Sequence, residues 1–180
     1  MLADLVAREA PDKPIIIDYC AGAGGKTLAI AARLNNRGRI LAADVDAKKL
    51  EELRRRARRA TVSNAQAAVL PWPRELDRTR ADVVFVDAPC SGIGALRRNP
   101  EARWRLRESD IAGFVQRQKE IVAAARQMCA PGGKLVYATC SLLRAENEGV
   151  VADMKRLRDD LVVTPNRHGT DGFFAAVLGT

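Results

Sequence analysis

Short apolar runs alternate along the chain with longer stretches in which apolar residues recur at helical spacing. The runs predict strands, and the run at residues 83–86 indicates a strand buried on both faces, because nothing polar interrupts it. The weakest run lies at residues 66–70. The predicted strands span residues 15–17, 40–43, 66–70, 83–86, 133–138, 161–163 and 173–178.

Helical periodicity is clearest at residues 47–60, which place their apolar residues on one face. A longer helix is predicted to begin at a cap on Ser109 or Asp110 and to carry Gln118 as the single polar residue of its apolar stripe. Pro131-Gly132-Gly133 is expected to stop it. The remaining predicted helices span residues 2–9, 26–34 and 148–157.

The alternation of strands and helices predicts an α/β domain with a doubly wound, mostly parallel sheet and helices on both faces. Only about ten residues separate the last two strands, too few for a helical crossover, so we expect the last strand to be reversed. With 180 residues, the chain suffices for one domain with a substantial core. We therefore expect a single domain over residues 1–180.

Composition narrows the class of protein. No apolar run approaches the ~20 residues of a membrane helix, and the first residues lack a signal-peptide core, so we expect a cytoplasmic monomer without a membrane partner. Thirty Lys and Arg against 22 Asp and Glu give a net charge of +8. This excess favours a polyanionic partner, and a basic enzyme with no such partner is the alternative.

The cysteines do not form a metal-binding pattern. Cys20, Cys90, Cys129 and Cys140 include no Cys-x-x-Cys pair, and His168 is the only histidine. We therefore expect neither a metal site nor a disulfide framework. Cys129 is interpreted as a small buried hydrophobe at a helix end, and His168 as a surface residue.

Two predicted strands deliver reactive side chains. Asp87 and Cys90 follow the strand at 83–86, and Cys140 follows the strand at 133–138. Ligands of open α/β sheets bind at the carboxyl ends of the strands, so we expect both cysteines to face one site. The alternative is that both are small buried hydrophobes.

Three motifs carry a resemblance to a known family. Cys20-Ala-Gly-Ala-Gly-Gly-Lys-Thr27, Asp87-Ala-Pro-Cys-Ser-Gly92 and Ala138-Thr-Cys-Ser141 resemble, in this order, the signatures of RNA cytosine carbon-5 methyltransferases of the Fmu/Sun/NSUN type. The resemblance extends over residues 15–178. It implies a Rossmann-like class I methyltransferase fold, S-adenosylmethionine as cofactor, and ribosomal or transfer RNA as substrate in RNA methylation and rRNA processing.

The glycine-rich loop suits an anionic ligand, because its backbone allows close approach and free N–H groups at a helix N-terminus attract an anion. Asp44 ends the next strand, where an acidic residue bonds a ribose diol. An ordinary tight turn is one alternative. A phosphate loop is another, but Cys20 occupies the position of its first glycine. By resemblance, the methyl donor's site is lined by Cys20 (through its backbone), Ala21, Gly22, Ala23, Gly24, Gly25, Lys26, Asp44 and Asp87.

The implied chemistry needs an activated thiol. A thiolate adds to carbon 6 of cytosine, carbon 5 then takes the methyl group, a base removes the carbon-5 proton, and the thiol leaves. By resemblance Cys140 attacks and Cys90 assists release, while Asp87 stabilises charge on the ring edge. DNA cytosine methyltransferases instead attack from a Pro-Cys motif that resembles Pro89-Cys90.

A basic stretch follows the Cys90 loop and suits phosphate contacts and base stacking. The predicted RNA-binding residues are Arg97, Arg98, Arg103 and Trp104, against the alternative of a solvated loop with Trp104 packed inward. The arginines of residues 54–59 are interpreted as the solvated face of an amphipathic helix.

Two departures from the family keep other functions open. The family usually has an Asp after its third strand, where this chain reads Ala67-Ala-Val-Leu-Pro71, and Asp77 is a weak substitute. An N-terminal RNA-binding domain is expected to be missing. The alternatives are a P-loop-like nucleotide hydrolase and a non-catalytic RNA-binding relic of the methyltransferase fold.

Overall fold

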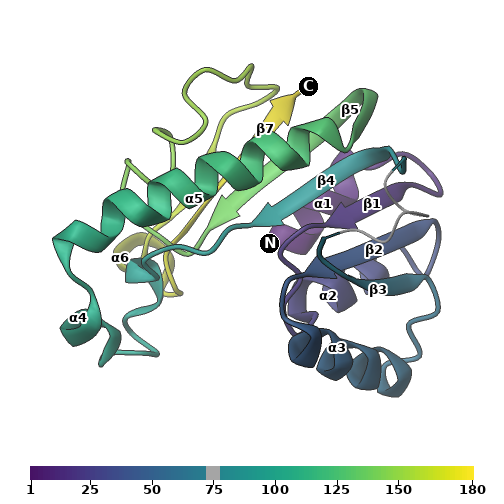
Figure 1. Cartoon of the computed structure of the whole chain (residues 1–180), viewed down its shortest axis with the longest axis horizontal. Coiled ribbons are helices and arrows are strands. Elements are labelled where there is room, and N and C mark those ends of the chain that lie inside the picture. Colours follow the sequence, from purple (N-terminus) through teal and green to yellow (C-terminus); the bar gives the residue numbers. More distant parts are fainter. Residues whose placement is uncertain (72–77) are drawn as a thin grey trace.

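A seven-stranded sheet forms the centre of the computed structural model, which describes residues 1–71 and 78–180 (Figure 1). In spatial order the strands are β3 (Ala65–Val69), β2 (Arg39–Asp44), β1 (Ile15–Asp18), β4 (Ala81–Asp87), β5 (Cys129–Thr139), β7 (Phe173–Gly179) and β6 (Leu161–Val163). Strands β1 to β5 pair in parallel, whereas β7 runs antiparallel to both β5 and β6. The predicted mostly parallel sheet with a reversed last strand is confirmed.

Helices cover both faces of this sheet, as predicted. They are α1 (Leu2–Glu9), α2 (Gly25–Arg33), α3 (Ala47–Arg59), α4 (Ala102–Arg105), α5 (Glu108–Gln127) and α6 (Pro165–His168). The first three pack on one face, and the long α5 crosses the other (Figure 1). Within residues 1–71 and 78–180, no helix has the length and apolar character needed to cross a membrane.

The core is divided between the two faces because successive side chains of a strand point to opposite sides. In β4, Val83 and Phe85 pack with α1 and α2, while Val84 and Val86 pack against α5. All four are fully buried. The uninterrupted apolar run therefore predicted a strand covered on both sides, and this prediction is confirmed.

The predicted helix at residues 148–157 is wrong: this segment is a series of turns. Its backbone bonds include Val150 N–H to Asn147 O at 3.1 Å and Met154 N–H to Val151 O at 3.2 Å, both spanning three residues. The Arg156 guanidinium donates to the carbonyls of Val151 and Met154. The guanidinium thus occupies carbonyl acceptors that an α-helix would use for its own backbone hydrogen bonds. These side-chain contacts override the helix propensity of the segment.

The ends of α5 also differ from the prediction. The helix begins at Glu108, one residue after its N-cap Arg107, rather than after a cap on Ser109 or Asp110. Asp110 is instead the third residue of the helix, and its carboxylate accepts a hydrogen bond from the Arg107 backbone N–H at 2.9 Å. At the other end α5 stops at Gln127, and residues 131–133 belong to β5, where a register shift against β4 takes up the extra residues.

Replacing Gly24 with alanine is expected to destabilise the protein. Gly24 has φ +81°, and an added Cβ would lie 2.5 Å from Cγ of Leu53, a side chain buried between α3 and the sheet. We expect Gly24→Ala to lower the free energy of unfolding by roughly 2–4 kcal/mol, from the left-handed backbone and from overpacking. Urea denaturation measures this change.

The matched control is Gly25→Ala in the same loop. An added Cβ there meets no atom within 4 Å in the part of the chain that the structure describes. The control should leave stability unchanged or raise it slightly, because alanine is the better helix former. Equal stability of the two variants would contradict the packing argument.

Candidate active site

Three neighbouring parallel strands end in aspartate. Asp18, Asp44 and Asp87 are the last residues of β1, β2 and β4, and parallel strands bring their carboxyl ends to the same edge of the sheet. The loop between β1 and α2 crosses this edge. The edge is therefore acidic and carries the glycine-rich loop, which is where an α/β sheet binds its ligands.

The glycine-rich loop is held in place by hydrogen bonds from two elements, β2 and α3. Asp44 Oδ2 accepts the Gly22 backbone N–H at 2.8 Å, and its Oδ1 accepts the Asp46 N–H at 2.9 Å. On the far side Arg56 of α3 donates to the carbonyl of Ala23 at 2.8 Å. The interpretation of Arg56 as a solvated residue is therefore wrong.

The loop and Asp44 fit an adenosyl ligand with a carboxylate tail. No side chain of residues 1–71 or 78–180 caps the N-terminus of α2, whose first N–H groups have no partner within the helix. A Cβ built on Gly22 or Gly25 would meet no atom of the described residues within 4 Å, so the backbone is open to them there. The Asp44 carboxylate has about four acceptor sites, and two backbone donors leave two for a ribose diol.

Burial perturbs one acidic group of the edge, Asp18. Asp18 is buried, and desolvation raises its pKa to about 7, although the Thr27 hydroxyl donates to its Oδ2 at 2.6 Å. Its Oδ1 has no hydrogen-bond partner among the described residues. Burial by itself lowers the pKa of Lys26. The ion pair with Asp87 raises this pKa by a larger amount, so the net shift is upward. Lys26 thus places a positive charge beside Asp87 at this edge.

The two cysteines that follow β4 and β5 are in contact. Their Sγ atoms lie 3.3 Å apart; Cys90 is half-buried and Cys140 exposed. The hydrogen bond from the Cys90 thiol lowers the pKa of Cys140 to about 7, with help from the Lys26 charge and against desolvation and Asp87. The pKa of Cys90 is raised by the same contact. Cys140 is therefore the more acidic of the two thiols.

The other two cysteines lie apart from this pair. Desolvation and the neighbouring carboxylates raise the pKa of the Cys20 thiol to about 12, which leaves it unreactive. Cys129 is buried, with its Sγ near the carbonyls of Ala125 and Lys134. Both observations agree with the sequence interpretation that Cys20 contributes backbone and Cys129 packing.

A buried carboxylate behind the cysteines was missed in the sequence. Glu146 accepts hydrogen bonds from Ser91 and Ser141, the residues after the two cysteines, and from Gln118 of α5. Gln118 is fully buried and also donates to the Pro89 carbonyl at 2.9 Å. A polar residue in an apolar stripe was the available signal for Gln118, whereas nothing in the local pattern marks Glu146.

The predicted RNA-binding residues lie in two environments. Trp104 is 79% exposed, so the inward-packed alternative is wrong, and the Arg103 guanidinium lies 4.6 Å from its ring centroid. Arg97 donates to the Gly169 carbonyl at 2.8 Å, and Arg98 forms an ion pair with Asp171. Trp104 and Arg103 are therefore exposed and in contact with each other, whereas Arg97 and Arg98 brace the loop at residues 169–171.

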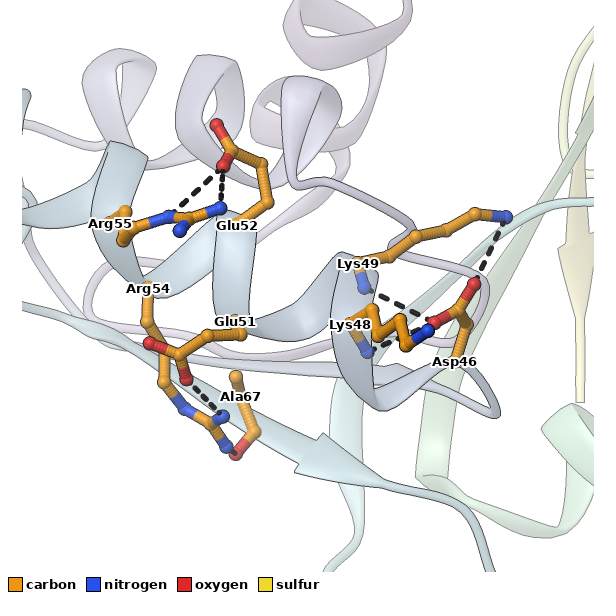
Figure 2. A network of polar contacts seen from close by, with 8 residues as sticks. All are labelled: Asp46, Lys48, Lys49, Glu51, Glu52, Arg54, Arg55 and Ala67. Atoms are coloured by element: carbon orange, nitrogen blue, oxygen red, sulfur yellow. Dashed lines mark hydrogen bonds and ion pairs between the residues drawn. The ribbon is translucent and has the colours of Figure 1, made fainter.

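Most of the arginines of helix α3 form ion pairs with glutamates of the same helix. Figure 2 shows Arg54 paired with Glu51 at 3.1 Å and Arg55 paired with Glu52 at 2.5 Å. Asp46 caps the helix by accepting the backbone N–H groups of the first turn. Apart from Arg56, the arginines of this helix are exposed, so the solvated-face interpretation holds for them.

Two sequence expectations have simpler outcomes. His168 is exposed at the end of α6, and its Nδ1 lies 3.1 Å from the backbone N of Thr164, as expected for a surface residue. Asp77, the substitute considered for the missing acidic residue after β3, lies outside the described residues. Among the described residues no group of His, Cys, Asp and Glu is arranged to hold a metal ion.

The order of the strands in the sheet, the reversed β7 and the glycine-rich loop after β1 are those of the class I methyltransferase fold. Residues 5–165 match the protein family described as 16S rRNA methyltransferase RsmB/F. The chain belongs to this RsmB/F, or NSUN-type, family of RNA cytosine carbon-5 methyltransferases.

Individual relatives agree with this assignment. The chain is 35% identical over 187 residues to ribosomal RNA small subunit methyltransferase B of Proteus mirabilis, covering 98% of this chain and 43% of the relative. The Vibrio cholerae protein of that name is 35% identical, with 91% and 41% covered. The crystal structure of NSun6 from Pyrococcus horikoshii with SFG superposes with a TM-score of 0.85 at 30% identity, covering 98% and 51%. The chain spans about two fifths of the length of these curated relatives.

The reactivity of Cys140 should follow the hydrogen bond from Cys90. Because the thiolate is the reactive form, the rate of alkylation by iodoacetamide should rise with pH through a midpoint near pH 7. In Cys90→Ala the donor is lost, so the midpoint should move up toward the ordinary thiol value. Mass spectrometry of the Cys140 peptide across pH measures both curves.

Cys90→Ser is the control, because its hydroxyl keeps a donor at the same position. Its midpoint should lie closer to that of the wild type. Identical curves for wild type and Cys90→Ala would contradict the proposed cause of the shift.

Proposed function

We propose that this chain is the catalytic part of an enzyme that transfers a methyl group from S-adenosylmethionine to carbon 5 of cytosine in RNA. The observation that carries the proposal is the contact between the sulfurs of Cys90 and Cys140, beside the Lys26–Asp87 ion pair. Family membership supports the reaction type. The names of the bacterial relatives favour ribosomal RNA over transfer RNA as the substrate.

Each of the two cysteines has a separate role in this proposal. Carbon 5 of cytosine is a poor nucleophile. When the Cys140 thiolate adds to carbon 6, carbon 5 becomes the nucleophilic carbon of an enamine. A bond between carbon 5 and the methyl group would then form as the bond from that methyl group to its sulfonium sulfur breaks, and the sulfur would leave as a neutral thioether. The carbon-5 proton then goes to a base, and the bond between carbon 6 and the Cys140 sulfur breaks. The lowered pKa favours Cys140 as the nucleophile, and Cys90 keeps the proton needed by an assisting group.

Asp87 and Lys26 are assigned to binding the cytosine ring and to stabilising the charge that develops on it. Asp87 ends β4 three residues before Cys90, and we assign its carboxylate to the polar edge of the cytosine ring. Lys26 holds this carboxylate from the start of α2. A preorganised ion pair here needs little rearrangement when charge develops on the ring.

S-adenosylmethionine supplies an electrophilic methyl group when bound. The residues that would hold it are the backbone of the loop from Cys20 to Lys26, for its carboxylate, and Asp44, for its ribose hydroxyls. The open backbone at Gly22 and Gly25 supports this assignment. Trp104 and Arg103 are proposed to stack on an unpaired base of the RNA and to contact its phosphates.

Replacing the two cysteines one at a time should give opposite results. Cys140→Ala should abolish methyl transfer to ribosomal RNA, because no thiolate remains to attack carbon 6. Cys90→Ala should retain the attack and accumulate a covalent protein–RNA adduct, because release is impaired. Transfer of a labelled methyl group and denaturing gels read out the two effects.

S-adenosylmethionine should still raise the melting temperature of both variants, which separates catalysis from cofactor binding. Stabilisation by ATP in its place would favour the nucleotide-hydrolase alternative. Normal turnover by Cys140→Ala would overturn the assignment of the nucleophile.

Removing the exposed indole should weaken RNA binding without affecting the fold. A stacked base contributes about 1–3 kcal/mol, so Trp104→Ala should weaken binding of single-stranded RNA roughly 5-fold or more. Arg58→Ala, an exposed change on α3, is the control and should have a much smaller effect. Fluorescence anisotropy at a fixed salt concentration measures both, and equal affinities for the two variants would remove Trp104 from the RNA surface.

A further inference from the structure

We infer that Glu146 is a positioning residue, whose buried carboxylate fixes the loop after β4 against the loop after β5 and so keeps Cys90 and Cys140 in contact. The importance of this contact for methyl transfer rests on the proposed function. The positioning itself rests only on the hydrogen bonds around Glu146 and can be measured without any methyl transfer.

The carboxylate bridges the two loops directly. Its Oε1 accepts the backbone N–H of Ser91 at 2.8 Å and the Nε2 of Gln118 at 3.0 Å. Its Oε2 accepts the hydroxyls of Ser91 and Ser141, each at 2.5 Å. Ser91 follows Cys90 and Ser141 follows Cys140, so one side chain holds both neighbours of the reactive pair.

These four donors match what a carboxylate needs. An ionised carboxylate only accepts hydrogen bonds and has about four acceptor sites, so the four donors fill it. All four donors are neutral, and Glu146 is fully buried. Burying a charge without a paired cation is costly, and an apolar side chain of similar size stabilises a core better. The carboxylate is therefore better explained by the geometry that it imposes than by stability.

The network extends to the residues before each cysteine. Gln118 also donates to the carbonyl of Pro89, which precedes Cys90. Asn147, next to Glu146, accepts from the Thr139 hydroxyl at 2.5 Å and donates to the Ser141 carbonyl at 3.1 Å, so it holds both neighbours of Cys140. The network thus fixes the backbone around both cysteines while leaving their sulfurs available for chemistry.

The backbone of Glu146 is anchored as well. Its carbonyl accepts the hydroxyl of Tyr137, a buried residue of β5, at 2.6 Å, and its N–H donates to the Leu143 carbonyl at 3.1 Å. The carboxylate is therefore attached to the same strand that delivers Cys140. Because Glu146 is fully buried behind the serines, it acts through them and is a positioning residue rather than a catalytic one.

Disulfide formation measures this positioning without substrate or cofactor. Diamide, a diazene, takes two hydrogens from two thiols and becomes a hydrazine, while the thiols become a disulfide. The rate depends on how often the two sulfurs meet. In the wild type Cys90 and Cys140 should cross-link rapidly, as followed by mass spectrometry of the joined peptides.

Glu146→Gln is the test variant, because it keeps the shape of the side chain but replaces one acceptor oxygen with a donor that faces hydroxyl donors. The loss of one charge-assisted hydrogen bond predicts cross-linking roughly tenfold slower. Glu120→Gln, the same change at an exposed carboxylate of α5, is the control and should cross-link at the wild-type rate. A folded Glu146→Gln that cross-links as fast as wild type would overturn the inference.

A second variant covers the case in which Glu146→Gln fails to fold. Ser141→Ala removes one of the four donors and should slow the same cross-linking by a smaller factor. A wild-type rate for Ser141→Ala would then overturn the inference.

Steady-state kinetics connect the positioning to catalysis. In Glu146→Gln, kcat for methyl transfer should fall while KM for S-adenosylmethionine stays unchanged, because the glycine-rich loop is not part of this network. A raised KM with unchanged kcat would contradict the role in catalysis. If the wild type transferred no methyl group, the proposed function would fail, and the cross-linking rates would still decide the positioning.

Discussion

The parallel pairing of β4 with β5 is the constraint on which the site depends. Its register places Asp87 opposite Ala138, and the ladder continues with the Ala88 N–H donating to the Ala138 carbonyl at 2.8 Å. Cys90 and Cys140 therefore leave adjacent strands at the same edge, three and two residues beyond this pair. A shift of the register by one residue would send alternate side chains to the other face and separate the two sulfurs.

The electrostatics of the edge result from a balance between opposing effects. Desolvation opposes a thiolate on Cys140, and the Asp87 carboxylate at the end of β4 disfavours it further. Against this, the Cys90 thiol donates to the Cys140 sulfur, and Lys26 contributes a positive charge. The same glycine-rich loop that suits a carboxylate tail thus supplies, through Lys26, part of the support for the thiolate.

Much of the fold followed from local pattern. Apolar runs located the strands because buried parallel strands need continuous hydrophobic side chains, and the short final connection indicated the reversed strand. The contact between Cys90 and Cys140 was also foreseeable, because ligand-binding residues of such sheets gather at the carboxyl ends of the strands. The residues whose role depends on their position along a strand could therefore be predicted from the sequence.

Residues whose role depends on long-range hydrogen bonds were not accessible. Arg56 resembles its exposed neighbours on α3, and only the tertiary structure brings it to the carbonyl of Ala23. Glu146 precedes a stretch with apparent helical periodicity, yet the Arg156 guanidinium holds that stretch in turns through the carbonyls of Val151 and Met154. Periodicity reports burial of apolar side chains, and it carries no information on which buried polar groups satisfy one another.

The most direct test of the account is to trap the covalent intermediate on RNA in which the cytosines carry fluorine at carbon 5. After thiolate addition and methyl transfer, carbon 5 has no proton for a base to remove, so the bond between carbon 6 and sulfur persists. With wild-type protein, ribosomal RNA and S-adenosylmethionine, the account predicts an adduct that mass spectrometry maps to Cys140. An adduct on Cys90, or no adduct, would contradict it.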